Sequence, residues 1–329
     1  MTAAVVADPQ TSGRNGRERA GWRAVLDPSN LATWAAPIAL LVLAVVFQIL
    51  NPTFLSLGNL QSMLTSAAIL IVLAIGQTFV VATAGIDLSI ASAMTLSAVV
   101  FGVVFDTGLL AAVVAAVLTG VAVGAINGLL VSRGRITDFI VTLGMLSAAS
   151  GAALILADGK PKTIISGPLL QLSTGTVWIF GYSFLIAIAL AALAHVVLFH
   201  TRFGTHVLAT GGNTEAAAAT GVATARIKTA VYIVAGSSAG IAAVLLVARV
   251  GAAEPASNTS FLLNSVAAVV LGGVSLFGGR ATIAGPVVGA LLLTALVNGL
   301  TLMGVAQFYQ PLSVGIVVVA AAFLTRFQK

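Results

Sequence analysis

Few residues in the sequence have side chains that could carry out chemistry. The 329 residues include 9 acids, 3 histidines and no cysteine. No G-x-x-x-x-G-K-[ST] phosphate-binding loop occurs, because the nearest candidate, Gly159-Lys160, is followed by Pro161. No H-E-x-x-H motif is present, and no nucleophile lies near a base and an orienting residue. We therefore expect no catalytic residues, no nucleotide hydrolysis and no cofactor bound by this chain.

Histidines and acids also fail to gather at the spacing of metal ligands. His195, His200 and His206 follow one another, but no carboxylate or cysteine lies beside them at ligand spacing. Structural and catalytic metal sites combine such residues, so a metal site is not expected.

Asp87 is the acid most clearly placed among apolar segments, in the stretch Ala84 to Ser89. A charge within a bilayer is costly, so such an acid lines an aqueous path or sits at an interface. In the topology given below it lies at the inner junction of the second and third spans, where it could cap the third helix. Both interpretations stay open.

Uncharged polar side chains are more plentiful in the apolar segments than charged ones. They suit a neutral, hydroxyl-rich solute better than an ion, although Ser, Thr and Asn also join helices to one another in any membrane bundle. The candidate translocation path consists of Asp87, Asn127, Thr142, Asn264, Ser275 and Asn298.

The elements that position these residues follow from composition. Hydrophobic residues make up 59% of the chain, charged residues 7%, and the mean hydropathy is +1.11. A soluble domain has about a quarter charged residues, so an all-α polytopic membrane protein is indicated. Ten segments approach the roughly 17–25 residues that a crossing helix needs. They are Trp34–Leu50, Leu60–Thr83, Leu88–Phe105, Leu109–Val131, Phe139–Ala157, Val177–Phe199, Thr229–Ala248, Phe261–Phe277, Thr282–Met303 and Pro311–Thr325. The third, eighth and tenth are short enough to be broken or partly re-entrant.

Positive charges fix the orientation of these ten spans. With the N-terminus inside, 12 of the 15 lysines and arginines are cytosolic, and only Lys160, Lys162 and Arg249 are outside. This segregation predicts that both termini are cytosolic. Residues 1–30 are predicted to be a flexible cytosolic tail and residues 31–329 the transmembrane domain. Because the basic residues fall at span ends, nucleic-acid binding is not expected.

One polar stretch, residues 202–228, lies on the cytosolic side between two spans. Asn213 is a good N-cap, Glu215 suits the first turn, and Gly221 is placed to end a helix. These residues predict a helix from Thr214 to Thr220. Its sequence has no strong apolar stripe to bury against its own chain, so we interpret it as a docking element for a cytosolic partner. An ordinary structured loop is the alternative.

On the outer side, Ala157–Thr176 and Arg249–Ser260 are the longest connections, and they could contact an extracytoplasmic partner or be plain solvated loops. A short repeat is also visible. Asn127-Gly128-Leu129 recurs as Asn298-Gly299-Leu300 five spans later, a spacing that would invert the second copy.

Several short motifs occur together in a recognisable order. They are Gly85-Ile86-Asp87-Leu88-Ser89, Asn127-Gly128-Leu129-Leu130, Phe139-Ile140-Val141-Thr142-Leu143-Gly144-Met145, Gly212-Asn213 with Glu215-Ala216-Ala217 and Gly221-Val222, Ala267 to Gly273, Gly278-Gly279, and Asn298-Gly299. With these motifs the chain resembles, from about Asn51 to its C-terminus, the permease subunits of bacterial ABC importers of the ribose, xylose and galactose type.

The resemblance implies a multi-pass permease of the bacterial inner membrane that takes up a monosaccharide or a related polyhydroxylated solute. It implies a cytosolic ABC ATPase subunit that uses ATP and Mg, a second permease chain, and an extracytoplasmic sugar-binding protein. The ATPase would be coupled through Gly211, Gly212, Asn213, Thr214, Glu215, Ala216, Ala217 and Gly221. A stand-alone secondary transporter or facilitator of a small polar solute is the alternative, and it would need a membrane carboxylate such as Asp87.

Departures from the family pattern are specific. The family commonly has two prolines where this chain has Thr137-Asp138, acids at the positions of Leu262 and Asn264, and glycines at those of Ala84 and Ala281. Leu262 and Asn264 lie at the outer start of the eighth predicted span, so solute choice or partner contact could differ there.

Overall fold

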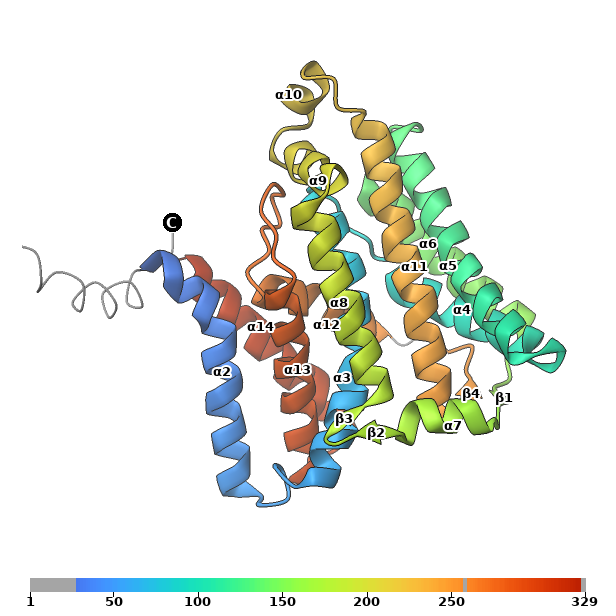
Figure 1. Cartoon of the computed structure of the whole chain (residues 1–329), viewed down its shortest axis with the longest axis vertical. Coiled ribbons are helices and arrows are strands. Elements are labelled where there is room, and N and C mark those ends of the chain that lie inside the picture. The colour runs from blue at the N-terminus through green and yellow to red at the C-terminus, as the bar shows by residue number, and fades with distance from the viewer. Residues whose placement is uncertain (1–27, 257–258, 327–329) are drawn as a thin grey trace, which may run out of the picture.

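The computed structural model describes residues 28–256 and 259–326, and these are almost entirely helical (Figure 1). The helices are α2 (Pro28–Leu50), α3 (Leu57–Ala82), α4 (Ile90–Val104), α5 (Leu109–Ser132), α6 (Asp138–Leu156), α7 (Gly167–Thr174), α8 (Tyr182–His200), α9 (Arg202–Gly212), α10 (Thr214–Ala219), α11 (Thr224–Val250), α12 (Thr259–Leu271), α13 (Ala284–Leu302) and α14 (Gln310–Arg326). Short 3-10 turns cover Phe105–Thr107 and Gln307–Tyr309. The prediction of an all-α fold is confirmed.

Four two-residue strands form two small antiparallel pairs. Strand β1 (Lys162–Thr163) pairs with β4 (Ala252–Ala253), and β2 (Thr176–Val177) pairs with β3 (Phe180–Gly181). Together with α7 they lie at the end of the molecule opposite α10 (Figure 1).

Each of the ten predicted spans coincides with one helix. Within the described residues, seven helices are long and apolar enough to cross a membrane, and Ala35–Leu50, Thr259–Leu271 and Gln307–Val319 are shorter apolar helices. Helix α12 has 13 residues, about 20 Å at 1.5 Å per residue, which is less than the roughly 30 Å of a hydrocarbon core. This length fits the expectation that the eighth span is broken or partly re-entrant, which stays a prediction.

Two predicted span boundaries were wrong. The flexible tail predicted for residues 1–30 stays a prediction, because residues 1–27 lie outside the described part; α2 begins at Pro28, and proline suits the first turn of a helix. The span predicted from Val177 begins only at Tyr182, after the β2–β3 hairpin. The span predicted to end at Phe277 stops at Leu271, and a loop of residues 272–283 follows.

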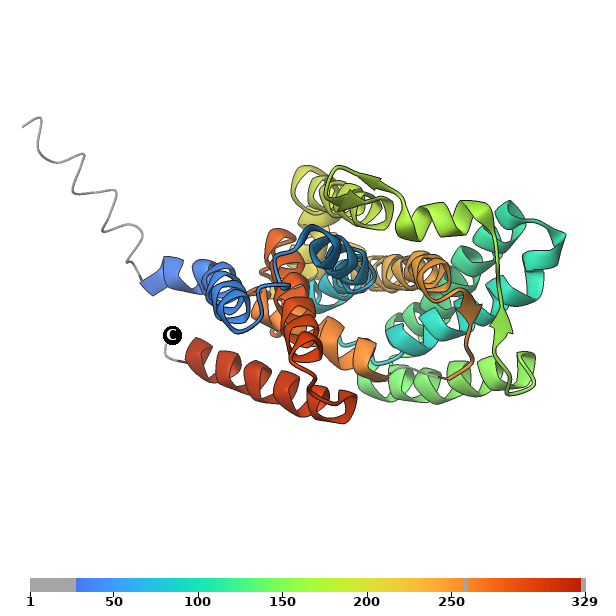
Figure 2. The ribbon, with the colours of Figure 1, turned by 90° about the horizontal axis from the view of Figure 1, so that it is seen from below.

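Helix α3 forms the centre of the bundle. In its most apolar 18-residue window 89% of the residues are buried, and it packs against α8, α11, α12 and α13 (Figure 2). A helix that is apolar on all sides can lie within a protein core or face lipid, and α3 is surrounded by other helices. Its two ends therefore carry the loops that are most constrained by other helices.

Helices α5 and α11 cross at very short range. A Cβ atom on Gly236 would overlap the carbonyl oxygen of Gly120 and lie 3.0 Å from the amide nitrogen of Gly124. Small residues let helix backbones approach closely in membrane bundles. This crossing therefore depends on glycine on both helices.

Packing in the second half repeats that of the first half with inversion. If α3, α4, α5 and α6 are matched with the helices five spans later, α11, α12, α13 and α14, most of the packed pairs have a packed counterpart. The pairs α4–α5, α4–α6, α5–α6, α4–α11 and α5–α11 correspond to α12–α13, α12–α14, α13–α14, α12–α3 and α13–α3, and all of these are in contact. Asn127-Gly128 lies near the α10 end of α5, whereas Asn298-Gly299 lies near the opposite end of α13 (Figure 1). The repeat suggested by the two Asn-Gly-Leu triplets is thus supported by the packing.

Candidate functional site

Helix α10 stands at one tip of the molecule (Figure 1). Its N-cap is Asn213, whose Oδ1 accepts a hydrogen bond from the amide of Ala216 at 2.9 Å. The amides of Gly221 and Val222 donate to the carbonyls of Ala218 and Ala217, and Gly221 has φ +88°. The predicted helix is confirmed to within one residue, since it ends at Ala219 and not at Thr220.

The faces of α10 differ in exposure. Ala217 is buried against the protein, whereas Glu215, Ala216, Ala218 and Ala219 are exposed. The preceding Gly211 is buried, and Gly212 and Asn213 are exposed. Most of the predicted coupling residues are therefore open to a partner.

Helix α9, which the sequence analysis did not predict, packs beneath α10 (Figure 1). Thr201 caps it by accepting a hydrogen bond from the amide of Gly204, and Phe203 stacks on Phe79 of α3 with ring centroids 6.4 Å apart. Val207 is completely buried. The apolar residues Phe203 and Val207, four apart, were the available signal for a helix facing the bundle.

Cations gather at the α10 end of the molecule. Arg202 begins α9, Arg226 and Lys228 lie in the first turns of α11, and Arg133 and Arg135 follow α5. In the part of the chain that the structure describes, the two ion pairs lie at the opposite end, Lys160 with Asp158 (3.5 Å) and Lys162 with Asp106 (2.6 Å). The charge of the α10 end is therefore not neutralised within the described residues.

The linker between α3 and α4, residues 83–89, is held at Ile86 by two helices, α6 and α11. Asp138 of α6 accepts a hydrogen bond from the amide of Ile86 at 2.7 Å. The Ile86 carbonyl accepts hydrogen bonds from Tyr232 of α11 at 3.2 Å and from Thr142 of α6 at 3.4 Å. The peptide of Ile86 is thus fixed on both sides.

Asp87 lies in this linker and is buried. Its Oδ1 accepts hydrogen bonds from the amide (2.8 Å) and hydroxyl (2.7 Å) of Ser89, and Asn127 donates to that hydroxyl at 2.8 Å. Burial raises the pKa of the Asp87 carboxyl, and the hydrogen bonds from Ser89 oppose part of this rise. Asp87 organises the turn before α4, which resembles the capping interpretation, although the N-cap position itself is Ser89.

Two departures from the family pattern meet at the same place. Ala84 has φ +59°, a left-handed conformation that glycine adopts more readily than alanine. Asp138, at a position where the family commonly has proline, accepts the hydrogen bond from the Ile86 amide. In this chain the linker is therefore held by an aspartate side chain, which a proline at that position could not replace as a hydrogen-bond acceptor.

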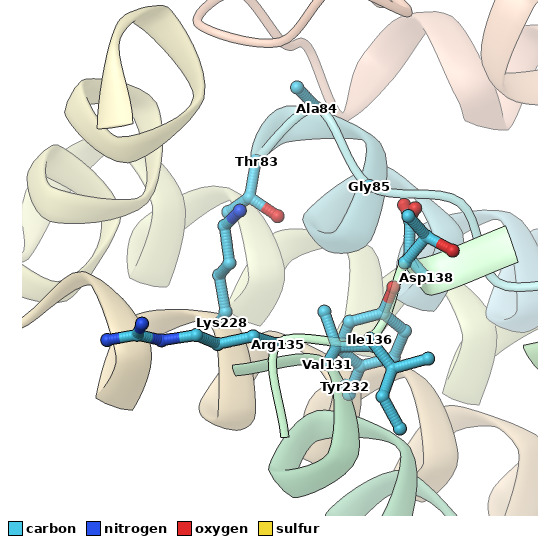
Figure 3. Close-up of a pocket in the computed structure, with 10 residues that line it drawn as sticks. Thr83, Ala84, Gly85, Val131, Arg135, Ile136, Asp138, Lys228 and Tyr232 are labelled. Atoms are coloured by element: carbon cyan, nitrogen blue, oxygen red, sulfur yellow. The ribbon is translucent and has the colours of Figure 1, made fainter. Parts of the chain in front are cut away.

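A pocket of about 220 Å³ opens beside this linker (Figure 3). It is lined by Thr83, Ala84, Gly85, Val131, Arg135, Ile136, Thr137, Asp138, Lys228 and Tyr232. In Figure 3 the side chain of Lys228 extends towards Thr83, while Asp138 and the hydroxyl of Tyr232 lie close together below Gly85. The pocket combines both signs of charge with hydroxyl groups.

The six candidate path residues do not form one lining. Asp87, Asn127 and Thr142 come together around the 83–89 linker, and Ser275 is part of the 272–283 loop. Asn298 exchanges two amide hydrogen bonds of 2.9 Å with Asn59 near the other end of α3, and Asn264 is half-buried on α12. Asn59 and Ala82 are separated by about 35 Å of helix. The Ser275 hydroxyl accepts a hydrogen bond from the amide of Phe277 at 3.3 Å, so five of the six residues make contacts within the protomer. Which residues line a path stays a prediction.

No group of three or more His, Asp or Glu residues that could hold a metal ion occurs among residues 28–256 and 259–326.

Comparisons with known proteins place the chain in a family. Residues 59–322 match the family described as "Branched-chain amino acid transport system / permease component". The chain belongs to this family. It is a multi-pass inner-membrane permease, as the resemblance noted in the sequence implied.

Individual relatives cover most of the permease. It is 36% identical over 302 residues to the ribose import permease protein RbsC of Escherichia coli (strain K12), covering 87% of this chain and 91% of the relative. Identity to RbsC of Bacillus subtilis (strain 168) is also 36% over 302 residues, with 88% and 91% covered. The L-arabinose ABC transporter permease protein AraH of Azospirillum brasilense is 34% identical over 291 residues, with 88% and 86% covered. No solved structure matches the chain.

Proposed function

We propose that this permease is the membrane subunit of an ATP-driven ABC importer that carries a monosaccharide or a related polyhydroxylated solute. The observation that carries the proposal is the similarity over most of the chain to permeases whose names state ribose import, L-arabinose transport and D-allose transport. A family of transport permeases also fits a chain in which the sequence offers no catalytic group.

The solute class needs a separate argument, because the family description refers to branched-chain amino acids. An amino acid is a zwitterion, and a path for it would place charged partners among the spans. Within the helices counted as spans, buried polar side chains are almost all uncharged, for example Gln77, Thr78, Asn127 and Ser265. This favours a neutral solute with many hydroxyl groups.

ATP would be hydrolysed by a separate cytosolic ATPase subunit that docks on α10. Three features support α10 as the coupling element: it is defined by its own cap, it is largely exposed, and it stands at the end where the cations gather. Positive residues favour the cytosolic side of a membrane, so the α10 end is assigned to the cytosol. The start of α2 at Pro28 and the end of α14 at Arg326 then lie towards the cytosolic side as well (Figure 1).

Other partners follow from the same orientation. A second permease chain would complete the passage, and an extracytoplasmic binding protein would dock on the opposite end, where α7 and the two strand pairs lie. Because the chain itself has no energy source, ATP can drive transport only by binding one conformation of the whole complex more tightly than the other.

The decisive experiment is reconstitution. The permease is co-purified with the ATPase and the binding protein encoded beside it, placed in vesicles, and supplied with the sugar that the binding protein holds. We expect uptake that requires ATP and stops when the phosphate-loop lysine of the ATPase is replaced. Uptake by the permease alone, driven by a proton or sodium gradient, would instead support the secondary transporter and refute the proposal.

A further inference from the structure

The loop between α12 and α13, residues 272–283, continues where α12 stops. Since α12 is only about 20 Å long, the loop leaves the helix pair part-way through the bundle. It rises from there towards α9 (Figure 1). Non-helical backbone at membrane depth is tolerated only where protein or a water-filled cavity surrounds it, so this loop must be held by its neighbours.

The loop is closed on itself and fixed at its base. The amide of Ser275 donates to the carbonyl of Arg280 at 3.2 Å, and the amide of Gly278 donates to the carbonyl of Ser275 at 3.0 Å. At the base, a Cβ atom on Gly285 would overlap the carbonyl oxygen of Gly272. The two helices and their loop therefore form one stiff hairpin, which we call the α12–α13 hairpin.

The tip of this hairpin touches α9 and the end of α3 through backbone atoms. The amide of Gly279 donates to the carbonyl of Ala82 at 3.1 Å. A Cβ atom on Gly211 would overlap that same carbonyl oxygen and lie 2.7 Å from the amide nitrogen of Gly279. A Cβ atom on Gly278 would lie 2.7 Å from the carbonyl oxygen of Gly211 and 2.8 Å from the amide nitrogen of Ala84. Three chain segments thus meet mainly through backbone atoms, and the only side-chain atom among these closest contacts is the Cβ of Ala84 beside Gly278.

This meeting point lies directly beside α10. Gly211 and Gly212 are the last residues of α9, Asn213 follows as the N-cap, and α10 begins at Thr214. The hydroxyl of Thr214 also donates to the carbonyl of Thr210 at 2.8 Å, which ties the two helices together. A displacement of α10 therefore reaches Gly211 without a flexible spacer.

From these contacts we infer that the hairpin tip at Gly278 and Gly279 is the positioning element through which α10 moves the α12–α13 hairpin. The inference rests on the proposed function and adds which part of the bundle responds. Helices α8 and α11 follow α10 because the chain connects them, whereas the hairpin lies some 50 residues further on and meets the α9–α10 segment at this contact. Side chains can change rotamer and absorb a small shift, but backbone atoms in direct contact cannot. The hairpin and α10 consequently move together.

A matched pair of substitutions tests the contact. Gly278 and Gly273 lie in the same loop and both have φ +77°, but a Cβ atom on Gly273 would meet nothing within 4 Å. Alanine at either position carries the same backbone strain, and only Gly278→Ala also pushes the tip away from α9. In the reconstituted complex we expect Gly278→Ala to lower the solute imported per ATP hydrolysed by about fivefold or more, the lower end of typical coupling between sites. Gly273→Ala should leave that ratio nearly unchanged. Equal ratios in the two variants would overturn the inference.

Distances between spin labels test the joint movement directly and do not depend on Gly278→Ala folding. The chain has no cysteine, so labels can be placed at Glu215→Cys on α10, Phe277→Cys at the tip and Ile140→Cys on α6, all at exposed positions. Between the nucleotide-free and ATP-trapped complexes, we expect the 215–277 distance to stay constant while the 140–277 distance changes. A change in 140–215 without a change in 140–277 would overturn the inference alone. Constant distances between all three sites in a complex that transports would remove the coupling role of α10 as well.

Discussion

Replacing Asn213 by alanine removes the cap of α10 and little else. The lost contact is the 2.9 Å hydrogen bond from the amide of Ala216, and Asn213 is exposed, so no packing is lost with it. Loss of an Asn cap costs about 1 kcal/mol, which is about a fivefold change in a local equilibrium. A helix of six residues is not stable on its own, so this cost falls directly on the order of α10.

The effect is measured in the complete complex. We expect Asn213→Ala to reduce solute uptake per ATP by up to about fivefold, while the melting temperature of the permease in detergent stays nearly unchanged because α10 is peripheral. Asn213→Ser is the matched control, since serine also caps helices and should retain uptake. If the alanine and serine variants transport equally well, the order of α10 does not matter for coupling and the reasoning fails.

Three further changes probe the rest of the scaffold. Gly221→Val places a β-branched residue at φ +88°, which should unwind the end of α10 and reduce uptake while the melting temperature of the permease stays nearly unchanged. A large fall in melting temperature would contradict a local effect. Gly236→Val should prevent α5 and α11 from packing and abolish a folded permease in detergent, whereas Gly144→Val, with nothing within 4 Å, should leave the protomer folded, as size-exclusion profiles would show. Tyr232→Phe removes the 3.2 Å hydrogen bond to the Ile86 carbonyl and should destabilise the protein by about 1 kcal/mol, seen as a small fall in melting temperature; no fall would mean that the Thr142 hydrogen bond suffices for that carbonyl.

Local signals in the sequence predicted α10 because they act within a few residues. Asn213 caps the helix and Gly221 adopts the conformation that ends it, and both depend only on the neighbouring backbone. The apolar segments likewise predicted where helices lie in the bundle. The predicted span boundaries at Val177 and Phe277 were wrong, because apolar residues also occur in a hairpin or in a loop packed against protein. Hydropathy does not distinguish such segments from a helix.

Roles of the polar residues could not be predicted in the same way. Asn298 pairs with Asn59 from 239 positions away, and the Ile86 carbonyl is held by Tyr232 from 146 positions away. Such partners are decided by tertiary packing, so a polar residue in a span gives no sign of whether it faces a solute or another helix.

The inverted repeat explains why one loop of the second half carries the contact to α10. Helices α4 and α12 are equivalent, and each is shorter than the helix that precedes it, α3 or α11. In the first half, α4 joins α5 through only the Phe105–Thr107 turn and Gly108, at the end opposite α10. In the second half the equivalent connection has grown to residues 272–283, and inversion places it on the α10 side. Extra residues at a junction that faces α10, the proposed coupling helix, give the bundle a contact that its pseudo-symmetric copy lacks, so a force applied at α10 would act on the two halves unequally. Unequal response of two similar halves is what a change between inward-open and outward-open forms requires.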